Sequence, residues 1–365
     1  MQFSHEAATI VEAVQNVCRL GSDPVGLART QQEGSAVAAG WKQLGELGFL
    51  DWRDIAPGGL VDGAPEPLRA VLVGVGSSLI AGPTLEAFMW LPILDAAISE
   101  SQGKDVLGHA RNGTSLVTIA GAAGQPGTAP IGPDSGAIES GVLRVTEPIV
   151  LANLPLVDDV VFLVRATSGD VVIACVAAAD LEARPISLLD DTQPYHTIQA
   201  LDVETSWTHT LPRDKFEELR ERLQAGAAIA SLTMVAGALG GVVDITRRYV
   251  LEREQFGQPI GGFQAVKHTM ARMLASAKQA EATAGVLSGS LGTGTLPLLC
   301  AWEAIMADAV AVAESAVHLH GGMGFSAETA PHLYLKRIWA WSSVGGLRQS
   351  TVEAWGQALE THTVR

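Results

Sequence analysis

The chain has 365 residues, of which 47% are hydrophobic and 17% are charged, and its formal net charge is −15. This composition indicates a globular protein with a large buried core and excludes a disordered chain. The negative charge argues against nucleic acid and anionic membrane surfaces as partners, so small molecules or other proteins are the expected ligands.

The cysteines suggest a reducing compartment, and the N-terminus agrees with this. The three cysteines lie far apart with no CxxC spacing: Cys18, Cys175 and Cys300. This spacing offers no metal-binding framework. Among the nine histidines only His318 and His320 are close, and two helical residues that far apart face different ways, so we predict no metal site. The N-terminal stretch MQFSHEAATIVEAVQ lacks a signal-peptide pattern, so we expect a cytoplasmic protein.

Residues 1–110 are predicted to form an N-terminal helical domain. Apolar residues recur there at helical spacing, namely Phe3, Ile10, Val14 and Val17. A second helix is expected to end in a glycine turn at Gly48.

Residues 111–210 are predicted to form a small β-domain. Short β-branched runs occur at 115–120, 141–150, 157–165 and 170–177, and Gly, Pro, Asn and Asp separate them. The run from Val160 to Val164 is interpreted as a buried core strand, and residues 121–136 as a loop.

Residues 211–365 are predicted to form a C-terminal four-helix-bundle domain. Helices are expected over 211–254, 263–287, 298–319, 329–341 and 346–358. The uncharged run from Leu223 to Val243 approaches the roughly 20 residues that can span a bilayer. We interpret it as a core helix instead, because it is rich in Ala and Gly and continues directly into Asp244 and Arg247.

A break at Phe256-Gly257-Gln258-Pro259 separates the first two of these helices. Arg253 and Gln255 precede it, and a guanidinium fork beside an amide can donate to phosphate or carbonyl oxygens. By itself, this stretch is equally compatible with a plain helix–loop–helix corner that carries surface charges.

Two ordered stretches closely resemble signatures of the acyl-CoA dehydrogenase family. They consist of Tyr249, Arg253, Gln255-Phe256-Gly257, Pro259-Ile260, Phe263-Gln264-Ala265 and His268, followed by His320-Gly321-Gly322-Met323-Gly324-Phe325. The resemblance covers essentially the whole chain and implies an α+β fold, with an N-terminal helical domain, a middle β-barrel-like domain and a C-terminal helical bundle.

The resemblance also implies where a catalytic glutamate should stand, at one of two positions. Counting without gaps places Gly345 at the first position. Anchoring on residues 237–240 places Ala230 at the second, with Ser231 in place of a substrate-contacting arginine. The acidic residues of the same helix, Glu218, Glu221, Glu252 and Glu254, are interpreted as solvated charges. We therefore predict no catalytic residue in this chain.

The family features that hold the flavin ring within one subunit are also missing. Residues 129–136 replace the usual Thr-Glu-Pro-x-x-Gly-Ser-Asp-like loop, and no tryptophan follows before Trp207. The residues that reach the FAD of a neighbouring subunit in this family are kept, with His318 in place of a common glutamine. The predicted cofactor-binding residues are Arg253, Gln255, Phe256, Ile260, His318, Gly321, Gly322 and Gly324.

This asymmetry suggests a partner subunit of a heterotetrameric α2β2 acyl-CoA dehydrogenase. Such a chain is expected to be inactive alone and to complete the FAD site of a catalytic sister subunit, which binds the acyl-CoA. The resemblance further implies a bulky or steroid side-chain acyl-CoA and an electron-transfer flavoprotein-type acceptor.

Two alternatives stay open. One is a self-sufficient homotetrameric dehydrogenase with a non-standard base, for which Asp134, Asp308 and Glu328 are candidates. The other is a flavin-free scaffold or binding protein that uses the same fold.

Overall fold

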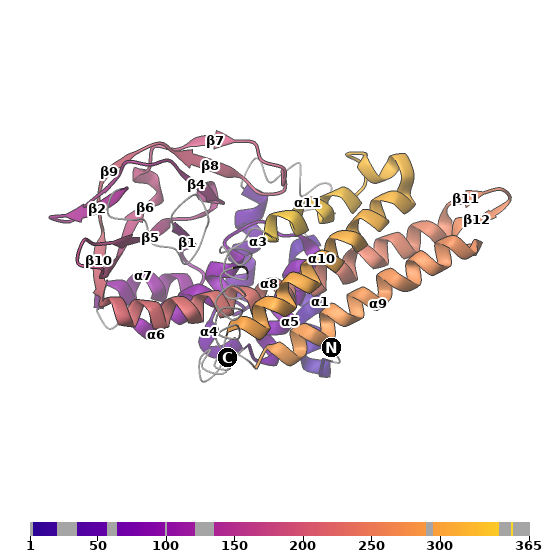
Figure 1. The fold of residues 1–365 in the computed structure, drawn as a ribbon, viewed down its shortest axis with the longest axis horizontal. Coiled ribbons are helices and arrows are strands. Elements are labelled where there is room, and N and C mark those ends of the chain that lie inside the picture. Colours follow the sequence, from indigo (N-terminus) through magenta and orange to yellow (C-terminus); the bar gives the residue numbers. More distant parts are fainter. Residues whose placement is uncertain are drawn as a thin grey trace, which may run out of the picture.

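The computed structural model of the chain describes residues 3–19, 35–56, 64–98, 101–120, 135–289, 295–342 and 352. Along the chain, helices come first, strands follow, and helices return, as Figure 1 shows from indigo to yellow. This arrangement is the predicted α+β architecture.

The N-terminal part is helical, as predicted. Its elements are α1 (His5–Arg19), α3 (Ser35–Glu46), α4 (Trp52–Ile55), α5 (Glu66–Ser78), a π-helix (Glu86–Trp90), α6 (Leu91–Ala97) and α7 (Ser101–Arg111). Val14 and Val17 are buried, in agreement with the helical spacing. Gly48 has a φ of 78°, which confirms the glycine turn after α3.

The middle part carries ten strands among the described residues. They are β1 (Val117–Ala120), β2 (Gly136–Glu139), β3 (Val142–Val145), β4 (Ile149–Ala152), β5 (Asp159–Arg165), β6 (Val171–Ala177), β7 (Arg184–Ile186), β8 (Tyr195–Ile198), β9 (Leu201–Glu204) and β10 (Trp207–Leu211). They form a four-stranded sheet, β1-β5-β6-β10, and two three-stranded sheets, β2-β3-β9 and β4-β8-β7. Within the first sheet β1 and β5 are parallel, and the other pairs are antiparallel.

The prediction of one strand over residues 141–150 is wrong. That segment forms β3 and β4, which belong to different sheets. Pro148 lies between them and has no N–H to donate to a sheet, so the ladder cannot continue through it. The core strand from Val160 to Val164 is confirmed, because no residue in it is more than 2% exposed.

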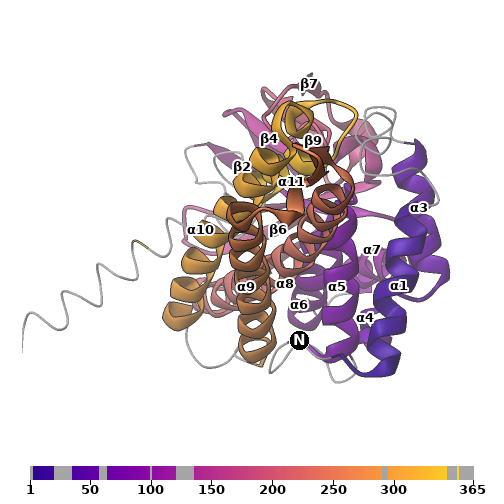
Figure 2. The same cartoon turned by 90° about the vertical axis from the view of Figure 1, so that its right-hand side faces the viewer.

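The C-terminal part contains the long helices of the bundle. They are α8 (Arg213–Glu252), α9 (Gln264–Leu287), α10 (Thr295–His320) and α11 (Pro331–Trp341), close to their predicted bounds. Figure 2 shows α10, α9, α8, α5 and α1 side by side, with α8 central. Of the helix predicted over 346–358, only Val352 lies within the described residues.

Two of the described helical segments are apolar and long enough to cross a membrane. In α8 the apolar window is 89% buried, so the run from Leu223 serves as the core of the bundle. In residues 296–325, which include α10, the corresponding window is only 44% buried. A smaller share of this window than of the α8 window is therefore buried within the described residues.

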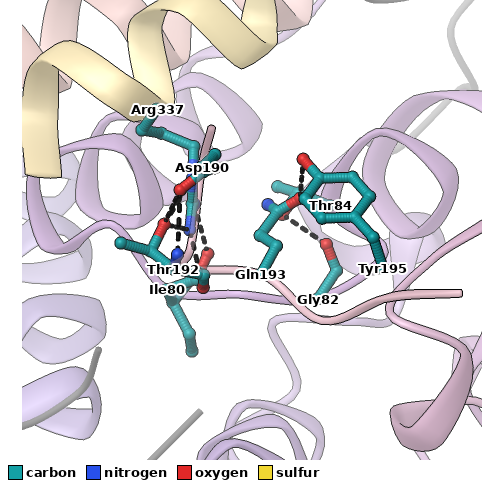
Figure 3. Close-up of polar contacts among 8 residues, drawn as sticks. All are labelled: Ile80, Gly82, Thr84, Asp190, Thr192, Gln193, Tyr195 and Arg337. Carbon is teal, nitrogen blue, oxygen red and sulfur yellow. Dashed lines mark hydrogen bonds and ion pairs between the residues drawn. The ribbon is translucent and has the colours of Figure 1, made fainter. Parts of the chain in front are cut away.

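A buried arginine connects the three parts of the chain. Arg337 of α11 is 1% exposed, and its Nε donates to Oδ2 of Asp190 over 2.8 Å. Its Nη1 donates to the carbonyl of Ile80 over 3.0 Å, and its Nη2 donates to the carbonyl of Thr192 over 3.1 Å. Figure 3 shows these contacts between α11, the β7–β8 segment and the turn after α5.

Candidate functional site

Four of the predicted site residues lie where α8 ends. Arg253 caps the helix, and the strands β11 (Glu254–Gln255) and β12 (Gln258–Pro259) form a short hairpin after it. At the turn, Phe256 and Gly257 have φ values of 54° and 80°, as a tight type I′ turn requires. The hairpin projects beyond the helices at the far end of the bundle (Figure 1).

Phe256 presents its ring to solvent from this turn. Its side chain is 92% exposed, and the edge of its ring meets Phe263 with the centroids 6.2 Å apart. A non-glycine residue in the left-handed region costs about 1–2 kcal/mol. An exposed aromatic held in a strained conformation is typical of a residue kept for function.

Arg253, Gln255 and Ile260 share the hairpin with Phe256. Ile260 donates its N–H to the carbonyl of Arg253 over 2.8 Å, which closes the base of the hairpin. Within the described residues the exposed guanidinium of Arg253 forms no ion pair. The hairpin therefore offers a free cation and an apolar face, although the chain as a whole is acidic.

The remaining predicted residues lie at the end of α10. A short 3-10 helix, Gly321–Phe325, follows His320 and is here called the glycine turn. Gly321 has a φ of 60°, and a Cβ at Gly324 would lie 2.3 Å from the carbonyl oxygen of Val317. Only glycine fits this close approach, so the turn folds back on α10. His318 and Phe325 are exposed beside it.

The ends of α8 and α10 meet through one aromatic pair. The rings of Tyr249 and His320 stack with centroids 4.2 Å apart and an interplanar angle of 23°. Both predicted groups of residues consequently lie at one end of the bundle. We call the hairpin and the glycine turn together the tip (residues 253–263 and 318–325).

The predicted position of a catalytic glutamate is closed by packing. Ala230 is fully buried, and Ser231 donates to the carbonyl of Ala227 over 2.7 Å. The indole of Trp302 donates to the hydroxyl of Ser231 over 2.9 Å. No ionisable side chain occurs between Ala227 and Ser231.

The neighbouring turn of α8 is covered just as tightly. A Cβ at Gly226 would lie 3.0 Å from Cδ1 of Ile93 and 3.3 Å from Cε of Met89. The indole of Trp90 donates to the carbonyl of Leu223 over 3.0 Å. The π-helix and α6 therefore lie directly on α8 at this turn.

The structure describes only some of the other positions that were predicted to lack a catalytic or flavin-holding group. Gly345 and residues 129–134, which include Asp134, lie outside the described residues. Trp207 packs against α7 near Gly103 and belongs to the core. Of the alternative bases, Asp308 lines a groove between α9 and α10, and Glu328 is exposed. Neither lies beside Ala230 on α8.

Glu86 in the π-helix is a buried acid that the sequence analysis did not single out. It is 7% exposed and accepts a hydrogen bond of 2.8 Å from the hydroxyl of Thr118 on β1. Burial raises the pKa of Glu86 to about 7, although the hydrogen bonds oppose this shift. The available signal was an acid in the apolar run from Pro83 to Leu94.

A cavity of about 440 Å³ lies elsewhere, between α1, α5, α8, α9 and α11. Ser77, Gly240, Asp244 and Lys278 are among its lining residues, and no residue of the tip is. The described residues contain no cluster of three metal-ligating side chains. The tip is thus the feature that combines exposed aromatic rings, a free guanidinium and accessible glycine backbone.

Residues 220–354 match the family model described as acyl-CoA dehydrogenase, C-terminal domain. The acyl-CoA dehydrogenase FadE34 of Mycobacterium tuberculosis is 38% identical over 122 residues, which cover 32% of this chain and 17% of that protein. The acyl-CoA dehydrogenase IpdE2 of M. tuberculosis is 30% identical over 190 residues, which cover 50% of this chain and 55% of that protein. The matches therefore span at most about half the length of these relatives.

Solved structures match along nearly the whole chain. The ChsE4–ChsE5 complex from M. tuberculosis has a TM-score of 0.72 at 22% identity and covers 98% of both chains. The Tcur3481–Tcur3483 steroid ACAD has a TM-score of 0.73 at 17% identity and covers 99% of both chains. A glutaryl-CoA dehydrogenase from Mycobacterium smegmatis in complex with FADH2 has a TM-score of 0.75 at 14% identity over 97% of this chain and 95% of that chain.

These matches define the class of the protein. The chain has the acyl-CoA dehydrogenase fold from its N-terminal helices to α11. Residues 220–354 of this chain are similar to the C-terminal domain of the acyl-CoA dehydrogenases.

Proposed function

We propose that this chain is a partner subunit of a heteromeric acyl-CoA dehydrogenase. It has no catalytic base of its own and completes the FAD site of a catalytic sister subunit through the tip. The acyl-CoA binds in the sister's site, where its α,β-bond is oxidised. When bound, FAD supplies the hydride acceptor for that oxidation.

One contrast carries the proposal. The turn of α8 that should hold the catalytic glutamate carries Ala230, and neighbouring side chains pack it closed. The tip, by comparison, exposes Phe256 and the free guanidinium of Arg253. In a chain with neither activity nor a partner subunit, a strained and exposed phenylalanine would cost stability and have no function.

The residues of the tip fit a dinucleotide. A guanidinium pairs with a pyrophosphate through two parallel hydrogen bonds, and Arg253 is free to do so. The backbone amides at Gly321 and Gly322 have no side chain between them and a ligand. The ring of Phe256 offers an apolar face, and His318 can provide a further hydrogen bond.

The structural neighbours support the rest of the proposal. One is a complex of two named proteins, ChsE4–ChsE5, and another is called a steroid ACAD. We therefore propose a heterotetramer and a bulky or steroid side-chain acyl-CoA as the substrate. An electron-transfer flavoprotein-type acceptor remains a prediction.

The test is the visible spectrum and native mass of the chain, alone and co-purified with a candidate sister subunit. We expect a colourless chain alone, and a yellow heterotetramer with about half a flavin per chain. The Arg253→Gln variant should form the same assembly with less flavin. The control is Arg247→Gln, which alters an exposed arginine that pairs with Asp244, and its flavin content should equal that of wild type. Stoichiometric flavin on the chain alone would contradict the proposal.

Glu86 favours a second candidate, the self-sufficient dehydrogenase with a non-standard base. It is a buried carboxyl with a pKa of about 7, and the π-helix that carries it covers α8. This candidate requires the chain alone to be yellow, to oxidise an acyl-CoA, and to lose that activity in Glu86→Gln. A chain that binds neither flavin nor a sister subunit would indicate the scaffold instead.

A further inference from the structure

Tyr249 and His320 connect the two halves of the tip at their roots. Tyr249 lies one helical turn before Arg253 on α8, so both side chains are on the same side of the helix. His320 directly precedes Gly321. Besides the ring stack, the hydroxyl of Tyr249 donates to the carbonyl of His320 over 3.3 Å. That carbonyl lies at the junction between α10 and the glycine turn, because His320 is the N-cap residue of the 3-10 helix.

The imidazole of His320 is fixed in one orientation. Its Nδ1 lies 2.8 Å from the carbonyl oxygen of Ala316, and a carbonyl only accepts, so this nitrogen carries a proton. The residue is 6% exposed, and burial lowers the pKa of His320, which favours the neutral ring. Tyr249 thus packs against a ring that cannot easily rotate.

Each half of the tip is also rigid with respect to its own helix. The hydrogen bond from Ile260 to Arg253 fixes the hairpin to α8. The glycine turn is fixed to α10 by the close approach of Gly324 to Val317, and the hydroxyl of Thr329 donates to the carbonyl of Met323. The distance between the two halves then depends on how the end of α8 contacts the end of α10. The stacked rings of Tyr249 and His320 form a contact at that point.

We infer that Tyr249 and His320 are positioning residues for the capture of FAD by the tip, an inference that rests on the proposed function. The stacked pair sets the separation between the guanidinium of Arg253 and the backbone amides of the glycine turn. Both groups can then engage one dinucleotide without rearrangement. A site whose groups are already in place loses less entropy on binding, so loosening the pair should weaken FAD binding while the subunits still assemble.

The experiment compares Tyr249→Leu, which removes the ring, with Tyr249→Phe, which keeps the stack and loses only the hydroxyl. Tyr334→Leu is the control, because Tyr334 is also a tyrosine whose hydroxyl donates to a backbone carbonyl, that of Ser77, and it lies outside the tip. Each variant is co-purified with the sister subunit, and its native mass and FAD affinity are measured. Hydrogen exchange of the backbone amides, measured on the chain alone, then reports the rigidity of the tip directly.

For Tyr249→Leu we expect an unchanged native mass, FAD binding weakened about tenfold or more, and faster exchange at residues 254–262 and 321–325. Tyr249→Phe should remain within about threefold of wild type, and Tyr334→Leu should leave FAD affinity unchanged. A yellow wild-type complex with unaltered FAD affinity in Tyr249→Leu would overturn the positioning role alone. A colourless wild-type complex would overturn the proposed function. Unchanged hydrogen exchange at the tip in Tyr249→Leu would refute the positioning role, whether or not the complex contains flavin.

Discussion

Arg337 and Asp190 form an ion pair with an Nε–Oδ2 distance of 2.8 Å, and both side chains are only 1% exposed. The pair joins α11 to the segment between β7 and β8. Thr192 in the same segment donates its backbone N–H to Oδ1 of Asp190 over 3.0 Å. The middle sheets enclose a second apolar core, while one face of the β1-β5-β6-β10 sheet packs into the core of the helices. The ion pair adds a polar contact between the sheets and the helices.

Arg337→Met should therefore destabilise the chain strongly. Removing one partner of a buried ion pair leaves the other charge unpaired, at a cost of about 3–5 kcal/mol. Lys336→Met is the control, since Lys336 pairs with Asp191 at the surface, where an ion pair contributes about 1 kcal/mol or less. Urea denaturation followed by fluorescence measures both changes in the free energy of unfolding. Equal effects of the two variants would show that Arg337 does not dock the cores.

Phe256→Asn should stabilise the isolated chain and weaken flavin capture. Asparagine tolerates the left-handed conformation that Phe256 adopts, and Asn-Gly is the favoured pair for a type I′ turn. We expect a gain of up to about 1 kcal/mol in the free energy of unfolding. In the complex with a sister subunit, flavin content should fall because the exposed ring is lost.

Phe325→Asn is the matched control for stability, because Phe325 is also exposed but lies outside the left-handed region. Its free energy of unfolding should stay close to that of wild type. Thermal denaturation and the flavin absorbance of the purified complex give the two readouts. If Phe256→Asn left both quantities unchanged, the conformation of Phe256 would carry no strain and its ring would have no role in flavin capture.

Much of the fold is predictable because its signals are local in sequence. The stop at Gly257 and Pro259 marks the end of α8, and the apolar spacing marks the helices. The hairpin residues are neighbours in the chain, so a short motif suffices to identify them as one group. The same is true of the glycine turn, whose close approach at Gly324 depends on nearby backbone.

The remaining features depend on residues far apart in the chain. Arg337 and Asp190 are 147 positions apart, and Tyr249 and His320 are 71 apart, so no pattern within one helix reveals either pair. The burial of Glu86 arises from its contact with β1, which follows a different helix. The split between β3 and β4, by contrast, had a local signal in Pro148, although the sheet that each strand joins depends on distant residues.

Ala230→Glu should not create an active dehydrogenase. The side chain would enter a fully buried position beside the hydrogen bond between Trp302 and Ser231. We expect a loss of about 3 kcal/mol or more in the free energy of unfolding, from overpacking and from burial of a carboxyl group. Ala282→Glu on the exposed face of α9 is the control, expected within about 0.5 kcal/mol of wild type. A stable, yellow Ala230→Glu variant that oxidises an acyl-CoA would show that the site is open.

Glu86→Gln should change how the stability of the chain depends on pH. The pKa of Glu86 is raised from 4.5 to about 7 by burial, so between these values the folded state binds a proton that the unfolded state has released. Wild type should therefore lose stability as the pH rises from about 4.5 to 7, with a total on the order of 3 kcal/mol. A neutral glutamine cannot titrate, and its carbonyl oxygen can still accept the hydrogen bond from Thr118.

Above pH 7 the Glu86→Gln variant should accordingly be more stable than wild type, and near pH 4.5 the two should converge. Urea denaturation at a series of pH values measures this difference. Glu139→Gln, which alters an exposed acid on β2, should leave the pH dependence of wild type in place. If Glu86→Gln followed the same curve as wild type, the carboxyl group would be ionised in the folded chain and would have a counter-charge or water that satisfies it. The raised pKa on which the candidacy of Glu86 as a base rests would then be wrong.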